Sequence, residues 1–375
     1  MPLGTLSGFT IAVTADRRSE EQASLIARRG GEVVHGPVIK TLPLGDEGGT
    51  REATLALIEQ PPDVVVFSTA LGVRGWCSAA AGMGLEDELL EAFAGAELVA
   101  RGKKAVGAII SSGLGEGIPL SSPTYAAILD AFVDRPATRP DGQRVRVAVQ
   151  LDGEDSGGIH LRLADLGFDV VAVPVYRWHL PDDLAPAERV VAAVADGRVD
   201  AVTFTSAHAV ANFVRIAERL AVLDRVRASC ADGQVAVVCV GPVTASRAAS
   251  FGLGGRVEPK QPRLGAMVAR LASSFDARAV ELSLDQVSVR LQGNLVRVGD
   301  GDPVSLTERE RSVLEVLSER QGAVVSKAAL LQRVWQDDSD EHAVEVTVGR
   351  LRRRLGPAGG SIETVMRRGY RLAAS

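Results

Sequence analysis

The stretch from Asp340 to Leu355 shows the clearest alternation of apolar and polar positions in the chain. Its apolar side chains recur at helical spacing and form one stripe: Val344, Val348, Leu351 and Leu355. The other side carries Val346, Gly349, Arg350 and Arg353. We expect a helix capped by Ser339 or Asp340, with one buried face and one cationic face. A cationic face fits the major groove of DNA, but taken alone it is also typical of a solvated surface helix.

The patterns around this stretch predict two more helices and a hairpin. Leu306–Leu317 reads as a helix capped by Thr307, with Glu310 as its capping-box partner, and Ser326–Trp335 reads as a shorter helix. Two extended runs follow, Ile362–Val365 and Gly369–Leu372, joined by Met366, Arg367 and Arg368. Three helices and a basic hairpin predict a winged helix.

Strands alternate with helices through the first 271 residues. The predicted strands include these segments: Phe9–Thr14, Glu32–Ile39, Asp63–Ser68, Lys104–Gly107, Arg144–Gln150, Asp169–Tyr176, Asp200–Thr205 and Val235–Val240. This alternation predicts parallel sheets covered on both faces, and the number of strands favours two α/β lobes.

One unit occurs twice, as DVVVFSTALGVRGW from Asp63 and as DAVTFTSAHAVANF from Asp200. Each copy is a strand that ends in Ser or Thr, followed by a helix that opens with small residues. Such junctions are where parallel sheets bind anions. Two similar lobes facing each other would form a cleft rimmed by hydroxyls and helix amides.

The composition is that of a globular protein, with 46% hydrophobic and 24% charged residues in 375. No apolar run approaches the roughly 18 residues of a membrane span, so we expect a cytoplasmic protein without a membrane partner. The net charge of −5 disfavours nucleic acid only if charge is spread evenly. From Ala279 onward, 14 Lys and Arg balance 14 Asp and Glu, so this part of the chain is neutral as a whole. Whether it can bind DNA therefore depends on where its positive charges cluster.

Cysteine and histidine residues are few and scattered. Cys77, Cys230 and Cys239 lie far apart in apolar contexts, which favours buried thiols over redox or metal roles. The five histidines show no metal-ligand spacing. We expect no metal site and no cofactor.

The C-terminal blocks LTERERSVLEVL, VVSKAALLQRVW, AVEVTVGRLRRRL and IETVMRRGYRL resemble the OmpR/PhoB-type DNA-binding effector domain over about Ala279 to Leu372. The resemblance implies that Val346 and Arg350 face bases. It also implies that Thr347, Arg352 and Trp335 approach phosphates. The other residues expected at the DNA are Arg353, Arg354, Thr364, Arg367 and Arg368. Met366 departs from the family, which usually has Arg directly after Thr-Val.

Effector domains of this type normally follow a phosphoacceptor domain, and the sequence argues against one here. Such a domain needs an Asp nucleophile at the end of its third strand, whereas the DVVVFS strand ends in Ser68. The first strand ends in Asp16, Arg17 and Arg18 rather than in paired carboxylates. We therefore do not expect control by phosphorylation.

The segments GFDVVAVPVYRW, AVTFTSAHAVANF and VAVVCVGPVTASRAASFGL resemble uroporphyrinogen-III synthase over about Gly8 to Leu271. The resemblance implies a discontinuous first lobe, with hinge crossings at Pro37–Leu44 and Val173–Trp178. The expected organisation is a synthase-like domain at 1–271, a linker at 272–278 and the DNA-binding domain at 279–375. Within the first domain, lobe one takes 1–38 and 178–271, and lobe two takes 44–173.

The same resemblance implies a cleft for hydroxymethylbilane, a linear tetrapyrrole with eight carboxylates that is cyclised without a cofactor. Tyr176 matches the tyrosine proposed to assist departure of the hydroxyl, although a hinge tyrosine with a satisfied hydroxyl is an equal alternative. Ser206 and Thr244 match positions that hold carboxylates. The remaining candidate ligand-binding residues are Ser68, Thr69, Thr205, Arg17, Arg18 and Arg177.

Several departures from the synthase pattern argue against turnover. Gln150 stands where the family often has Arg, and Asp152, Glu154 and Asp155 would repel a polycarboxylate. The first-lobe segment AVGAIISSGLGEG also lacks the Gly-x-x-Thr found at Gly241–Thr244.

Three functions fit the whole sequence. The favoured one is a transcriptional regulator whose synthase-like cleft senses a ligand or contacts a partner. The second is a bifunctional uroporphyrinogen-III synthase, a cyclising hydro-lyase that also binds DNA. In the third, the C-terminal domain binds only proteins. The expected partners are double-stranded DNA, a linear tetrapyrrole or other polyanion, a transcription factor or RNA polymerase, and a second copy on DNA. Resemblance to actinobacterial synthase-like regulators suggests nitrogen assimilation genes.

Overall fold

The computed structural model describes residues 3–44, 49–122, 124–153, 158–284, 286–335 and 340–373. The chain divides into two compact units. One unit combines Met1–Ile39 with Pro181–Ser375, and the other is Lys40–Leu180. The first unit contains lobe one and the C-terminal domain, and the second unit is lobe two.

Lobe one is built on a parallel five-stranded sheet in the order β12-β11-β10-β1-β2. Its strands are β1 (Thr10–Val13), β2 (Glu32–His35), β10 (Ala201–Phe204), β11 (Ala236–Cys239) and β12 (Arg256–Val257). The central strand β10 pairs with β1, so that Ile11 lies opposite Ala201. Segments far apart in the chain therefore form the middle of this sheet.

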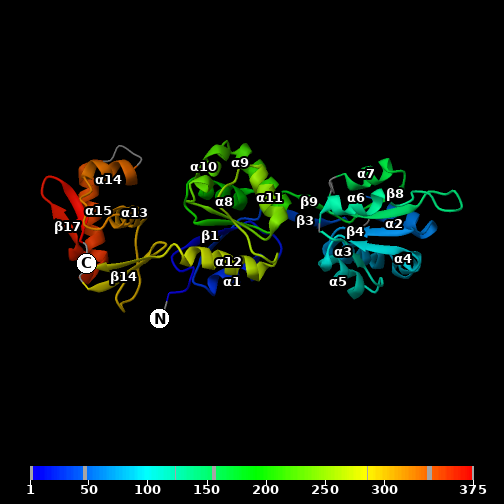
Figure 1. Ribbon diagram of the computed structural model, residues 1–375, viewed down its shortest axis with the longest axis horizontal. Helices are drawn as coiled ribbons and strands as arrows, with labels where there is room; N and C mark the ends of the chain where they lie inside the picture. The colour runs from blue at the N-terminus through cyan, green and yellow to red at the C-terminus, as the bar shows by residue number, and fades with distance from the viewer. Residues whose placement is uncertain are drawn as a thin grey trace. The chain divides into compact units, whose positions relative to one another are not determined.

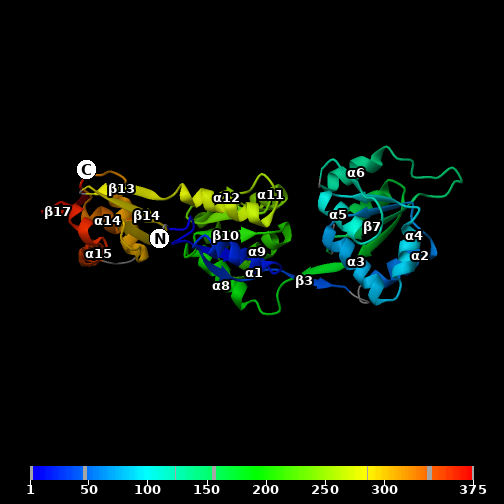
Figure 2. The same ribbon diagram turned by 90° about the horizontal axis from the view of Figure 1, so that it is seen from below.

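Helices cover both faces of the lobe one sheet (Figure 1). One face packs against α1 (Ser19–Ala27) and α12 (Leu264–Asp276), which are seen from below in Figure 2. The other face packs against α8 (Ala185–Ala195), α9 (Ala207–Arg219), α10 (Leu223–Ala231) and α11 (Pro242–Ser250). Phe9 and Phe275 anchor α12 to the sheet, with ring centroids 4.5 Å apart.

Lobe two repeats this plan with a parallel sheet in the order β6-β5-β4-β7-β8. Its strands are β4 (Val64–Phe67), β5 (Glu97–Ala100), β6 (Ile118–Pro119), β7 (Arg146–Leu151) and β8 (Asp169–Pro174). One apolar cluster joins the sheet to α2 (Thr50–Glu59), α3 (Ala70–Gly82), α4 (Glu86–Phe93) and α5 (Lys103–Ser111). A second cluster joins the other face to α6 (Tyr125–Val133) and α7 (Ile159–Asp165). Parallel sheets covered on both faces confirm the predicted α/β class.

The two crossings expected to form a hinge run side by side. They form an antiparallel pair, β3 (Lys40–Pro43) with β9 (Tyr176–His179). Leu42 lies opposite Arg177 in this ladder.

One element prediction was wrong, and the expected linker overlaps the end of a helix. Lys104–Gly107 lies inside α5, because Ala105, Ala108 and Ile109 bury one helical face, and the strand is the preceding β5. Residues 272–276 of the expected linker belong to α12, whose last turn buries Phe275. Only a short segment therefore separates α12 from the next domain.

The C-terminal domain is a winged helix, as predicted. It opens with an antiparallel sheet of β13 (Val280–Leu284), β14 (Val287–Gln292), β15 (Leu295–Val298) and β16 (Val304–Ser305). Three helices follow: α13 (Glu308–Ser318), α14 (Lys327–Val334) and α15 (Glu341–Arg354). After a 3-10 turn (Gly356–Ser361), β17 (Ile362–Val365) and β18 (Gly369–Leu372) form the wing.

The predicted capping box starts α13. The Thr307 N–H donates to Glu310 Oε2 at 2.8 Å, and the Glu310 N–H donates to Thr307 Oγ1 at 3.3 Å. No helix in the described ranges is long and apolar enough to cross a membrane.

Candidate nucleic-acid interface and ligand site

Helix α15 has the two faces that its sequence predicts. The stripe Val344, Val348, Leu351 and Leu355 is buried in the core of the winged helix. Arg350, Arg353 and Arg354 are exposed, and Val346 is 37% exposed beside them. Asp340 caps the helix by accepting the Ala343 N–H at 3.2 Å, whereas Ser339 lies outside the described residues. The helix therefore presents a cationic surface with one apolar side chain.

Arg352 ties α15 to the wing. Its Nε and Nη2 donate to the Ile362 carbonyl at 2.9 and 2.6 Å, and Nη2 also donates to Thr364 Oγ1 at 2.9 Å. Its guanidinium carbon lies 5.8 Å from the centre of the Tyr370 ring. A phosphate contact by Arg352 or Thr364 therefore has to share or replace these internal bonds.

Two other residues expected at the phosphates are packing residues in this structure. Thr347 is 8% exposed, and its hydroxyl donates to the Ala343 carbonyl at 2.8 Å. Trp335 is 4% exposed and belongs to the apolar core of the domain. Its Nε1 has no hydrogen-bond partner among the residues that the structure describes.

The wing tip is basic and carries an exposed apolar residue. Met366 is 84% exposed between β17 and β18. Arg367 adopts a left-handed backbone conformation with φ of 58°, which is costly for a residue with a β-carbon. The Arg368 N–H donates to the Val365 carbonyl at 2.9 Å and closes the turn. Both arginine side chains are exposed at the tip.

The repeated strand–helix junction has the same geometry in each lobe. In lobe two, Thr69 caps α3 by accepting the Gly72 N–H at 3.0 Å. In lobe one, Ser206 caps α9 by accepting the Ala209 N–H at 3.1 Å. Each cap follows the carboxyl end of the central strand of its sheet, directly after Ser68 and Thr205. Ser68 is buried, and its hydroxyl donates to the Gln150 carbonyl at 2.5 Å.

Tyr176 is only 3% exposed. Its hydroxyl lies 3.0 Å from Thr69 Oγ1, and its ring meets that of Trp178 edge-on at 5.1 Å. This is the geometry of a hinge tyrosine with a satisfied hydroxyl. Proton transfer to a ligand requires exposure of that hydroxyl.

Gln150 is fully buried beside the lobe two junction. Its Oε1 accepts the Thr69 N–H at 3.1 Å, and its amide donates to the Leu151 carbonyl. Gly72 allows this close approach, because a β-carbon would lie 2.0 Å from Gln150 Cδ. The neutral Gln150 side chain thus holds the start of the lobe two junction through the Thr69 N–H.

The expected repulsion by Asp152 needs correction. Arg101 Nη1 lies 3.1 Å from Asp152 Oδ2, and both side chains are largely buried, so the carboxylate is compensated. Glu154 and Asp155 lie outside the described residues.

The remaining ligand candidates differ in exposure. Arg17 and Arg18 are exposed at the start of α1, where Arg18 pairs with Glu21 at 2.6 Å. Arg177 is half-buried on β9. Thr244 is 4% exposed in the first turn of α11.

Comparison with known families decides the identity of the two lobes. Residues 20–269, two thirds of the chain, match the family model of uroporphyrinogen-III synthase HemD. The chain belongs to the uroporphyrinogen-III synthase family. Residues 301–372 match a second model, the C-terminal domain of transcriptional regulatory proteins. The winged helix is accordingly an OmpR/PhoB-type DNA-binding domain.

Individual relatives divide in the same way. The Bacillus subtilis (strain 168) protein YjjA is 27% identical over 273 residues, which cover 73% of this chain and 98% of YjjA. A mutant uroporphyrinogen III synthase from Thermus thermophilus is 26% identical and matches 72% of this chain and 99% of its own, with a TM-score of 0.58. The transcriptional regulatory protein PrrA of Mycobacterium tuberculosis is 37% identical over 100 residues, 26% of this chain and 42% of PrrA.

The cysteines of the synthase-family lobes are free thiols. Burial raises the pKa of Cys230 to about 11 and that of Cys239 to about 12, so these thiols stay protonated and unreactive. Within the described residues, no group of three or more His, Cys, Asp or Glu side chains could hold a metal ion.

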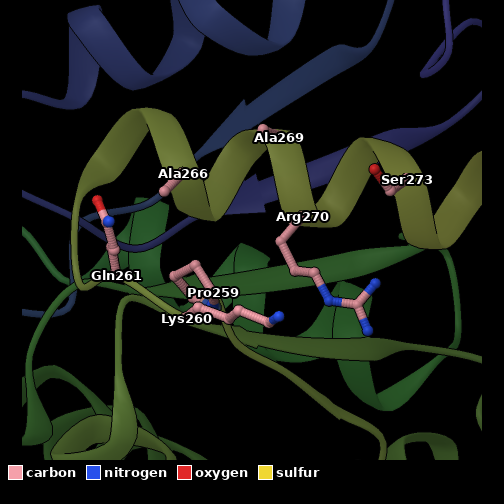
Figure 3. Close-up of a pocket in the computed structure, with 7 residues that line it drawn as sticks. All are labelled: Pro259, Lys260, Gln261, Ala266, Ala269, Arg270 and Ser273. Carbon is pink, nitrogen blue, oxygen red and sulfur yellow. The ribbon is translucent and has the colours of Figure 1, made fainter.

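The synthase-family fold also carries a shallow groove along α12 that the sequence did not indicate (Figure 3). Seven residues line it: Pro259, Lys260, Gln261, Ala266, Ala269, Arg270 and Ser273. Lys260 and Arg270 are exposed and extend over the same side of the helix. Neither residue lies in a recognisable motif, so only the fold brings them together.

Proposed function

We propose that this chain is a transcriptional regulator that reads DNA with α15 and the wing, and that its synthase-family lobes bind a regulatory ligand. The observation that carries the proposal is the exposed arginine face of α15. The opposite side of the same helix is the buried apolar stripe, and the helix belongs to an OmpR/PhoB-type domain fused to the lobes.

The two exposed surfaces of the winged helix fit different parts of a DNA duplex. Arg350 and Val346 project from the middle of α15, where Arg can pair with guanine edges and an aliphatic side chain can contact a thymine methyl group. Arg353 and Arg354 lie in the last turn of the helix, and Arg367 with Arg368 lie at the wing tip. These four charges suit phosphates on either side of the recognition helix.

The ligand that best fits the lobes is a polycarboxylate of the tetrapyrrole class. Each lobe ends its central strand at a hydroxyl-capped helix N-terminus, which favours negative charge. Arg17, Arg18, Arg177, Ser206 and Thr244 complete the proposed binding set. A regulatory ligand requires only binding, and a buried Tyr176 is compatible with that.

A second candidate is a bifunctional protein that also makes uroporphyrinogen III. Family membership over both lobes supports it. The burial of the Tyr176 hydroxyl against Thr69 argues against it, since that is the group expected to assist the reaction.

Two measurements on the full chain separate these functions. The first selects a DNA site from a random library and measures its Kd with and without uroporphyrin III, a stable octacarboxylate. A regulator shows a ~5- to 150-fold change, and the ligand Kd changes by the same factor in the presence of DNA. Identical isotherms exclude regulation by this ligand class.

The second measurement supplies enzymatically generated hydroxymethylbilane and scores type III against the spontaneous type I product. We expect only type I product from the wild type. Type III product from the wild type, in a yield that falls in Tyr176→Phe, supports the bifunctional protein instead.

The proposal has further parts. It includes action in the cytoplasm, nitrogen assimilation genes as targets, assembly as a dimer on direct repeats, and contact with another transcription factor or RNA polymerase.

A further inference from the structure

The internal repeat gives each lobe an aspartate in the same structural position. Asp63 precedes β4, and Asp200 precedes β10. The Asp63 N–H donates to the Arg146 carbonyl and its carboxylate accepts the Arg146 N–H at 2.7 Å, at the first residue of β7. Asp200 makes the same two bonds to Thr10, the first residue of β1, with the N–H to carboxylate distance at 2.8 Å. Each aspartate thus joins the central strand to its neighbour.

The two aspartates differ in what neutralises them. Asp63 binds Arg139 of its own lobe, with Nη2 and Nε at 2.6 and 3.0 Å from Oδ2. Asp200 meets Arg311 of the winged helix, whose Nη1 lies 3.4 Å from Oδ1. The Asp200 side chain is 18% exposed, and burial raises its pKa, while the Thr10 N–H and the charges of Arg311 and Arg278 oppose that rise. In lobe one, the cation in contact with this position therefore comes from another domain, and Arg311 binds Glu315 of its own helix as well, with Nε 2.9 Å from Oε1.

Hydrogen bonds to the main-chain carbonyls of residues 4–8 join the same two domains next to this ion pair. The Gln292 side-chain amide donates to the Gly4 and Ser7 carbonyls at 2.7 and 2.9 Å, and the Asn294 N–H donates to the Gly8 carbonyl at 2.8 Å. The backbones approach closely at Gly293, where a β-carbon would lie 2.1 Å from the Gly8 carbonyl oxygen.

A third contact lies at the end of α12. Arg290 of β14 reaches Asp276, the last residue of α12, at 3.1 Å. The winged helix is thus held to lobe one at three places and not only by the short segment after α12.

We propose that Arg311 and Gln292 are positioning residues, which dock the DNA-reading domain on lobe one in a fixed orientation. This dock consists of residues 4–8, Asp200, residues 292–294 and Arg311. A desolvated carboxylate left without its cation is costly, so separation of the domains is opposed at Asp200. The hydrogen bonds of Gln292 and Asn294 add direction, because they fit only one arrangement of the two backbones.

The dock also has a short path to the proposed ligand site. Asp200 precedes the four-residue strand β10, and Ser206, the cap of α9, follows that strand. A ligand held at the N-terminus of α9 therefore lies at one end of β10, and Asp200, at the other end of β10, contacts Arg311 of α13. This second part rests on the proposed function, whereas the dock itself does not.

Hydrogen exchange of the full chain tests the dock without ligand or DNA. In the wild type, we expect the Asn294 amide to exchange ~100-fold more slowly than an unprotected amide. The double variant Arg311→Met, Gln292→Ala should lose at least ~10-fold of that protection, while amides in β10 and in the middle of α13 keep theirs. Met retains the apolar stem of Arg311 without its charge. The matched control is Arg320→Met, on an exposed arginine of the same domain.

An unprotected Asn294 amide in the wild type would overturn the dock, as would equal protection in the double variant. General loss of protection in the variant indicates misfolding, and Arg311→Met alone then decides by the same comparison at Asn294.

The link to the ligand site is read from DNA Kd values with and without uroporphyrin III. Arg311→Met should keep its ligand-free Kd within ~2-fold of wild type, because Arg311 is not at the DNA surface, while the ratio of the two Kd values falls to about 1. An unchanged ratio refutes the link. If wild type itself shows no ligand effect, the sensing function and the link fail together, and the exchange result still decides the dock.

Discussion

Arg350 and Arg352 lie two residues apart on α15 but have different tasks. Arg350 is exposed on the cationic face, whereas Arg352 turns towards the Ile362 carbonyl and holds the wing. We expect Arg350→Ala to weaken binding of the selected site by ~1 to 3 kcal/mol, the scale of one bidentate base contact. Fluorescence anisotropy titration of labelled DNA measures this loss.

The matched control for Arg350 is Arg320→Ala, which removes an exposed arginine elsewhere on the same domain. It should leave the Kd within a factor of about two, as expected for a surface change away from the interface. Equal losses in both variants would show that net charge and not a base contact explains the effect.

Helical spacing was sufficient to predict the buried apolar stripe of α15 and the exposure of Arg350, but not the burial of Thr347. It could not predict the partners of Arg352, since these belong to a segment that packs beside the helix only after folding. The same limit applies to Asp152. Its neighbours in sequence suggested an acidic patch, but Arg101 compensates it from another part of lobe two.

Helix α13 starts where its capping residues place it, and this start can be tested. Thr307→Ala removes the oxygen that accepts the Glu310 N–H, which should cost about 1 kcal/mol of stability. Thr307→Ser keeps that oxygen and should lose much less. Urea unfolding, followed by circular dichroism, gives both values. Equal losses in the two variants would mean that the methyl group and not the cap matters.

Caps and long apolar stripes made the elements of the winged helix predictable, and the two wing strands have the predicted bounds. Short elements in lobe two were harder. The four residues of β5 carry no period long enough to distinguish a strand from the end of a helix, whereas the apolar positions of α5 predict a strand that the structure does not have. The sheet, and not the local pattern, decides between them.

Lobe two has a complete core of its own. Both of its apolar clusters consist of residues between Ala53 and Trp178, and its sheet pairs only with itself. We therefore expect a fragment of residues 40–180 to fold alone and to unfold in one cooperative thermal transition. In that fragment, Leu57→Ala should lower the free energy of unfolding by ~2 to 5 kcal/mol, because Leu57 is fully buried.

Circular dichroism and calorimetry of the fragment test this expectation. A fragment without native secondary structure, or one that unfolds gradually, would show that lobe two depends on the rest of the chain.

The family resemblance implied the two lobes, whereas neither the resemblance nor the pattern indicated the ion pair between lobe one and the winged helix. Asp200 and Arg311 are 111 residues apart, and no local pattern relates them.

The insertion of lobe two between β2 and β10 sets an order of events on the ribosome. Thr10 and Asp200, which join β1 to β10, are 190 residues apart. At ~5 to 20 residues per second, a nascent chain needs about 10 to 40 s to supply the partner strand. Lobe two is complete within that interval, whereas β1 can pair only with β2, and its edge that later pairs with β10 stays open and available to chaperones. The DNA-reading domain emerges after both lobes, so an incomplete polypeptide that stalls before it in translation cannot occupy a promoter.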